Sequence, residues 1–187
     1  MPGVRGTTRG QVNGFLPPLV AFDAIDTDTL NRCLIDWGHR MGPLHRPQFG
    51  HFGGAHALFH EGQPVAVVAT EQLAVAHTVG LSRADAFELA RVCAVRPDLC
   101  RVVLRLWRAF AFPAFCRASG CSWAISYQDR ALHTGALYRH DGWVRLGQTS
   151  SGTDPRARDG TRKGRRKTVW GWTDDAAAMA RAREAQQ

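Results

Sequence analysis

Residues 87–110 read FELARVCAVRPDLCRVVLRLWRAF, and within them a strand pattern gives way to a helix pattern. Residues 87–95 are mostly apolar, which is typical of a largely buried strand. Pro97 and Asp98 then suit the first turn of a helix, because proline is pre-set for that position and a carboxylate is favoured at the positive helix end. Roughly helical intervals separate the apolar residues that follow: Val102, Val103, Leu106, Phe110 and Phe115. The stretch therefore predicts a strand that leads into a long helix.

Polar residues interrupt the predicted strand, and proline and glycine limit the predicted helix. Glu88 and Arg91 interrupt the strand three residues apart, so strict alternation would put them on opposite faces unless a bulge intervenes. Farther along, Pro113 is expected to kink the helix, and Ser119-Gly120 to end it.

The elements predicted around this stretch alternate between strands and helices. Thr27 or Asp28 can cap a first helix that has apolar residues at helical spacing: Leu30, Cys33, Leu34 and Trp37. The other predicted elements are hairpin strands over 55–60 and 64–71, a strand over 122–126, a helix over 132–140, a strand over 143–148, an edge strand over 169–172 and a final helix over 174–185. This order predicts a single α/β domain built on a central mixed β-sheet flanked by helices.

The composition predicts a folded protein in three parts. At 187 residues, with 44% hydrophobic and 21% charged residues, the chain can bury one core. Residues 1–18 are expected to be a loose arm, 19–150 the globular domain, and 151–187 a basic loop followed by a strand and a helix. No apolar run reaches the ~20 residues that span a bilayer, and no secretory signal opens the chain, so we expect it in the cytoplasm of a bacterial cell, away from membranes.

Five cysteines are expected to be reduced core thiols, because they form no Cys-x-x-Cys pair: Cys33, Cys93, Cys100, Cys116 and Cys121. His51, His56 and His60 have spacings that fit no familiar zinc pattern, so we expect no metal.

The net charge of +8 is concentrated in one segment. Between positions 156 and 167 one acid, Asp159, stands among seven bases: Arg156, Arg158, Arg162, Lys163, Arg165, Arg166 and Lys167. Such a segment suits a nucleic acid, because bases that neutralise phosphates release counterions. A solvated charged loop is the alternative.

The turn between the predicted strand and the long helix is a candidate diphosphate site. Backbone amides at a helix N-terminus bind anions, and nearby arginines add charge. The candidate cofactor-binding residues are Val95, Arg96, Leu99, Cys100 and Arg101. An ordinary surface turn would look similar.

Residues 136–143, ALYRHDGW, resemble the Ala-x-x-Leu-Tyr-x-x-x-Gly-Phe signature of GNAT acetyltransferases. The resemblance implies a GNAT fold, acetyl-CoA or a related acyl-CoA as cofactor, and Tyr138 as the general acid that protonates the leaving thiolate. A phenol with a pKa near 10 is a reasonable donor to a thiolate of similar basicity. Tyr138 could instead only pack on its helix.

A narrower resemblance joins residues 87–91, 124–129 and 133–143. Together they look like the Mom family of phage DNA-modification proteins, which place a carbamoylmethyl group on adenine N6. This resemblance implies a site built from Glu88, Arg91, Ser126, Tyr127, Asp129 and Tyr138. Here Arg96-Pro97-Asp98-Leu99-Cys100-Arg101 replaces the glycine-rich pyrophosphate loop of ordinary acetyltransferases.

The candidate residues have structural alternatives. Asp129 could accept a proton from an amine or cap the following turn. Glu88 could serve in catalysis or pair with Arg91 or Arg101. Tyr127, with the loop aromatics Phe49 and Phe52, could stack on an extruded base or belong to the core.

Three functions remain open. The first is a DNA-modifying enzyme that protects phage or bacterial DNA from restriction by transferring a carbamoylmethyl-like group to adenine N6. Its nucleic-acid-binding residues would be Arg91, Tyr127, Arg162, Lys163, Arg165, Arg166 and Lys167, and its partner double-stranded DNA. The alternatives are an acetyl-CoA-dependent N-acetyltransferase of a small amine or protein, and a non-catalytic nucleic-acid-binding module.

Overall fold

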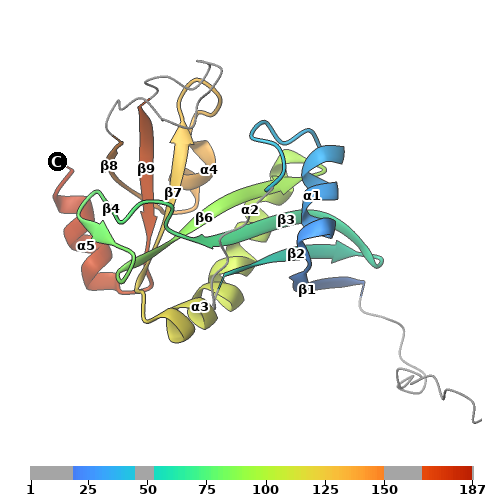
Figure 1. The fold of residues 1–187 in the computed structure, drawn as a ribbon, viewed down its shortest axis with the longest axis horizontal. Helices are drawn as coiled ribbons and strands as arrows, with labels where there is room; N and C mark the ends of the chain where they lie inside the picture. The colour runs from blue at the N-terminus through green and yellow to red at the C-terminus, as the bar shows by residue number, and fades with distance from the viewer. Residues whose placement is uncertain (1–18, 45–52, 150–165, 187) are drawn as a thin grey trace, which may run out of the picture.

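The computed structural model describes residues 19–44, 53–149 and 166–186, and it has one seven-stranded sheet at its centre (Figure 1). The strand order across the sheet is β1-β2-β3-β6-β7-β9-β8. Its strands are β1 (Val20–Ile25), β2 (Gly54–His60), β3 (Gln63–Gln72), β6 (Ala86–Ala94), β7 (Trp123–Asp129), β8 (Val144–Gln148) and β9 (Lys167–Trp172). All neighbours are antiparallel except β6 and β7, which are parallel. The predicted α/β fold on a mixed sheet is confirmed.

The parallel pair separates soon after it forms. Only Ala86–Glu88 pair with Trp123–Ile125, and beyond them β6 and β7 diverge. A bulge lies in the same part of β6, because Ala69 pairs with Arg91 while Thr70 pairs with Leu89. One residue, Ala90, is therefore extra, and the bulge stands between Glu88 and Arg91. The two central strands of the sheet, β6 and β7, are therefore separated over most of their length.

The predicted long helix consists of three successive segments: α2 (Pro97–Leu106), the π-helical turn η1 (Trp107–Ala111) and α3 (Phe112–Ser119). The irregularity lies before Pro113, where the Phe112 N–H bonds to the Trp107 carbonyl, five residues back. Pro113 has no N–H to donate to the Ala109 carbonyl, so the regular helical hydrogen bond is missing at this position, and the wider π-helical turn lies just before it. Gly120, with φ 77°, ends α3 as predicted.

Helices cover both faces of the sheet (Figure 1). On one face α1 (Thr27–Asp36) buries Leu30, Cys33 and Leu34 against β2, β3 and β6. Asp26, rather than Thr27 or Asp28, caps α1 by accepting a hydrogen bond from the Thr29 N–H. On the other face α2, η1 and α3 bury a larger core around Trp107.

Several predicted boundaries were wrong or missed. β9 is not an edge strand but lies between β7 and β8. The helix predicted from residue 132 is the shorter α4 (Ala136–His140), and the last helix is α5 (Ala176–Glu184). β1 and the small hairpin of β4 (His77–Thr78) and β5 (Leu81–Ser82) were not predicted. Of the described helices, none is long and apolar enough to cross a membrane.

Candidate functional site

A cavity of about 750 Å³ opens where β6 and β7 diverge. The N-terminal part of α2 and the short helix α4 form its other walls. Residues from these four elements line it, among them Leu89, Ala90, Cys100, Arg101, Ser126, Tyr127 and Tyr138. Segments far apart in the sequence therefore meet at the opening in the sheet.

Tyr138 stands on α4 between two tryptophans. Its ring stacks on Trp170 with centroids 5.7 Å apart and packs edge-on to Trp143 at 5.3 Å. Its hydroxyl lies 2.7 Å from Ser126 Oγ, which lies 2.9 Å from the Leu89 carbonyl oxygen. When Ser126 donates its single proton to Leu89, Tyr138 is the donor to Ser126. Burial raises the pKa of Tyr138, so its hydroxyl is protonated at neutral pH.

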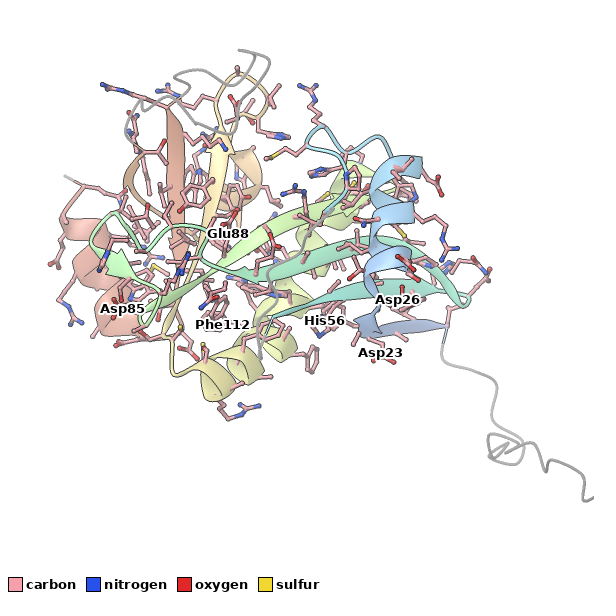
Figure 2. All side chains as sticks on the ribbon, in the orientation of Figure 1. Asp23, Asp26, His56, Asp85, Glu88 and Phe112 are labelled. Atoms are coloured by element: carbon pink, nitrogen blue, oxygen red, sulfur yellow. The ribbon has the colours of Figure 1, made fainter. Side chains whose placement is uncertain are left out.

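Glu88 precedes the cavity residue Leu89 on β6 and has a strongly shifted pKa, although its own side chain is not part of the cavity lining. Burial raises its pKa to about 7, and Glu71, directly opposite on β3, adds to the rise. The charges of Arg91 and Lys167 act in the opposite direction. Leu89 packs into the core on the α2 side, so alternation directs Glu88 to the other face, where β6 and β7 separate (Figure 2). Glu88 can therefore take up a proton near neutral pH.

Asp129 ends β7 and caps the turn that follows it. Its Oδ1 accepts a hydrogen bond of 2.9 Å from the Ala131 N–H, which is the structural alternative weighed for it. It does not line the cavity, and it lies opposite Lys167 in the pairing of β7 with β9.

The strand-to-helix turn contributes only part of its predicted residues to the cavity. Cys100 and Arg101 line it, whereas Val95, Arg96 and Leu99 do not. Arg96 pairs with Asp98 at 2.6 Å on the exposed surface, and Leu99 packs against the core. Arg101 donates to the His140 carbonyl at 2.7 Å, which connects this turn to α4.

Burial raises the pKa of the Cys100 thiol to about 11. Cys100 is therefore a neutral thiol at physiological pH and a weak nucleophile.

The predicted nucleic-acid-binding residues are spread over the molecule. Arg91 donates to the carbonyls of Ala90 and Gly42, and Tyr127 lines the cavity. Arg166 is exposed and Lys167 begins β9. The predicted residues Arg162, Lys163 and Arg165, like Phe49, His51 and Phe52, lie outside the described residues.

Thr149, at the end of the chain's preceding described part, meets Lys167, the last base of the basic segment, beside β7. The Thr149 N–H donates to the Lys167 carbonyl at 2.9 Å, and the Lys167 N–H donates to Thr149 Oγ1 at 3.0 Å. Because Lys167 lies opposite Asp129 in the register of β9 with β7, this junction lies at the end of β7 that follows the cavity residues Ser126 and Tyr127. Thr149 and Lys167, the described residues on either side of this part of the sequence, therefore meet at the cavity end of the sheet.

Sequence reasoning missed residues that loops bring to the cavity. These are His39 and Met41, on the loop after α1, whereas His133 and Thr134 before α4, which also line it, belong to the segment that resembles Mom proteins. Burial, with the nearby charges of Arg91 and His133, lowers the pKa of His39 to about 4. The only sequence signal was the glycine-flanked loop from Gly38 to Gly42.

Within the described part of the chain, no three or more His, Cys, Asp or Glu side chains gather in a group that could hold a metal ion.

Comparisons with known proteins find likeness in structure and none in sequence. No family model matches the chain, and no curated protein sequence matches it.

Solved structures match most of its length. The ribosomal-protein-S18-alanine N-acetyltransferase from Escherichia coli has a TM-score of 0.54 at 13% identity over 82% of this chain and 93% of that chain. The aminoglycoside 6'-N-acetyltransferase from Enterococcus faecium has a TM-score of 0.53 at 9% identity over 82% and 96%. A probable GNAT-family acetyltransferase from Chromobacterium violaceum has a TM-score of 0.53 at 13% identity over 85% and 90%. At identities this low the likeness shows the fold alone, and that fold is the one shared by GNAT acetyltransferases.

Proposed function

We propose that this chain is an acyl-CoA-dependent N-acyltransferase whose acceptor is a primary amine of a small molecule or a protein. One observation carries the proposal. Glu88, with its pKa near 7, and Tyr138, with its pKa raised, stand on the two faces of the sheet at the opening between β6 and β7. A proton acceptor on one side and a proton donor on the other are what amine acylation by a thioester requires.

The acyl donor has suitable surroundings on the α2 side. Acyl-CoA, when bound, supplies the thioester carbonyl that an amine attacks. The N-terminal amides of α2 and the Arg101 side chain would face its phosphates, because helix N-termini and arginines favour anions. The pairing of β6 with β7 ends at Glu88 and Ile125, so beyond these residues the two strand edges diverge beside the cavity, where an extended amide chain can bind.

The proton movements follow from the two pKa values. An aliphatic amine reaches the site as an ammonium ion, and Glu88, about half ionised at neutral pH, accepts one of its protons. The neutral amine forms the new C–N bond as the C–S bond breaks. Tyr138 gives its proton to the departing thiolate, and Ser126 can then turn its O–H from the Leu89 carbonyl toward the phenolate oxygen. The new amide nitrogen loses its extra proton to water, and proton exchange with water restores Glu88 and Tyr138.

Two of the similar structures are an aminoglycoside 6'-N-acetyltransferase and a ribosomal-protein-S18-alanine N-acetyltransferase, so aminoglycosides and alanine-containing peptides are acceptor classes to test. The purified protein is incubated with acetyl-CoA and a panel of aliphatic amines, aminoglycosides and peptides, and thiol release is measured. We expect release that requires an amine, and a fall in kcat of about 100-fold or more in Tyr138→Phe and Glu88→Gln. Arg117→Gln, on the exposed surface of α3, is the control. An unchanged kcat in both site variants would contradict the assignment.

A second candidate is modification of adenine in double-stranded DNA. It is favoured by the basic segment, whose last residue Lys167 lies at the cavity end of the sheet, and by the resemblance to Mom proteins. Nucleosides from plasmid DNA of expressing cells, analysed by mass spectrometry against an empty-vector control, decide between the two. A heavier deoxyadenosine species would establish the DNA reaction. Unmodified nucleosides together with amine-dependent thiol release would exclude it.

A further inference from the structure

The helix that carries Tyr138 cannot hold its own position. α4 has five residues, and its N-cap residue Gly135 supplies no side-chain hydrogen bond. A helix this short is unstable alone, because nucleation fixes several residues for one hydrogen bond. The place of the Tyr138 hydroxyl therefore depends on what holds the two ends of α4.

Arginines from α2 and η1 hold the C-terminal end of α4. Arg101 Nη2 donates to the His140 carbonyl at 2.7 Å, and Arg108 Nη1 donates to the Asp141 carbonyl at 2.9 Å. These two arginines and Arg105 are spaced at i, i+4 and i+7 on α2 and η1, so they share one helix face.

Arg108 and Asp141 form the most buried of these contacts. Arg108 Nη2 lies 3.1 Å from Asp141 Oδ1 and Nε lies 3.1 Å from Oδ2, while the Asp141 side chain is 0% exposed and that of Arg108 19%. Arg105 reaches the same carboxylate only at 3.4 Å, with 57% of its side chain exposed. The Nε–Oδ2 contact lacks hydrogen-bond geometry, but the bonds from Nη2 to Oδ1 and from Nη1 to the Asp141 carbonyl hold both the side chain and the backbone of Asp141.

The same guanidinium is connected to Tyr138 by ring contacts. Arg108 Cζ lies 4.0 Å from the ring centroid of Trp172. Trp172 packs on Trp143 at 6.4 Å, and Trp143 packs edge-on to Tyr138 at 5.3 Å. Arg108 thus supports both the end of α4 and the aromatic wall against which Tyr138 rests.

We propose that Arg108, through Asp141 and Trp172, is the positioning residue that fixes Tyr138 at the reaction centre. Arg108 does not line the cavity, so its effect passes through Asp141 at the end of α4 and through Trp172. Its catalytic consequence rests on the proposed function, because it assumes that Tyr138 donates the proton.

A double-mutant cycle tests the positioning role. Displacing a reacting group by about 1 Å can cost on the order of 100-fold in rate, so Arg108→Gln is expected to lower kcat by about 10- to 100-fold. The KM values for acyl-CoA and amine should stay within about twofold, since Arg108 does not line the cavity. In a Tyr138→Phe background the same substitution should have no further effect on kcat. Arg117→Gln, exposed on α3, is the control.

Hydrogen exchange provides a measurement that needs no substrate. We expect Arg108→Gln to speed exchange at residues 135–143 while the strands keep their protection. If removing one charge unfolds the protein, the neutral pair Arg108→Gln/Asp141→Asn leaves no buried ion and is measured instead. A folded variant with normal exchange at 135–143, or kcat losses that multiply fully with Tyr138→Phe, would overturn the positioning role. If the parent protein transfers no acyl group, the proposed function fails, and the exchange result alone decides whether Arg108 holds α4.

Discussion

Replacing Gly135 by alanine tests the support at the N-terminal end of α4. Gly135 has a φ of +73°, and a Cβ there would lie 2.6 Å from Oε1 of Gln128 and 3.0 Å from its Cδ. The Gln128 amide is buried, donates to the His133 carbonyl at 2.6 Å and accepts from Trp170 Nε1 at 2.8 Å. A methyl group at position 135 must therefore displace an amide that holds two hydrogen bonds.

The expected loss of stability has two parts. A non-glycine residue in the left-handed region costs about 1–2 kcal/mol. Displacing Gln128 leaves at least one buried polar group without its partner, which costs about 1–3 kcal/mol. Together they predict a loss of about 2–5 kcal/mol in the free energy of unfolding, a large part of the roughly 5–15 kcal/mol that holds a typical domain folded.

Urea unfolding of two alanine variants separates these parts. Gly120 has nearly the same conformation, with a φ of +77°, but a Cβ there would meet nothing within 4 Å. Gly120→Ala should lose only the backbone part, so Gly135→Ala should be less stable than it by about 1–3 kcal/mol. Equal losses in the two variants would refute the reasoning, because the Gln128 amide would then yield without cost.

Three further predictions concern charge and packing. Because the folded state raises the pKa of Glu88 to about 7, folding takes up a proton, and the free energy of unfolding should fall by about 3 kcal/mol as pH rises from about 4.5 to 7. Urea titrations at several pH values measure this pH dependence, which Glu88→Gln should remove. An unchanged pH dependence in Glu88→Gln would contradict the shift. Trp107→Phe deletes the buried Nε1 donor to Thr70 Oγ1 and leaves a void, so the free energy of unfolding should fall by about 2–4 kcal/mol. A loss of less than about 1 kcal/mol in the free energy of unfolding would contradict this prediction. If DNA binds the basic segment, neutralising four of its bases should flatten the salt dependence of DNA binding; these are Arg162, Lys163, Arg165 and Arg166. An unaltered salt dependence would exclude that role.

Local patterns predicted the elements whose signals are local. Pro97 and Asp98 fixed the start of α2, and the spacing of Glu88 and Arg91 indicated where a bulge would be needed. The place of β9 could not be read from such patterns, because strand order depends on pairing across the sheet. The residues Val169–Gly171 are nevertheless buried without alternation, and an unbroken apolar run of this kind is typical of an interior strand.

The candidate site was predictable only in part, for the same reason. Tyr138 stood out by its motif, but the tryptophan on which it stacks comes from β9, 32 positions later in the chain. The raised pKa of Glu88 depends on Glu71, from another strand, and on burial. The contact of Arg108 with Asp141 joins two helices whose approach no spacing in the sequence indicates.

The insertion of β9 between β7 and β8 has a consequence for synthesis of the protein. A ribosome makes residues 123–148 before residues 167–172, so β8 has no neighbour to pair with until the later strand emerges. Trp170 arrives in that same strand, and with it the stacking surface of Tyr138 and the hydrogen bond to Gln128. A nascent chain that ends before β9 therefore carries every proposed proton-transfer residue and still lacks a finished site until β9 has been made.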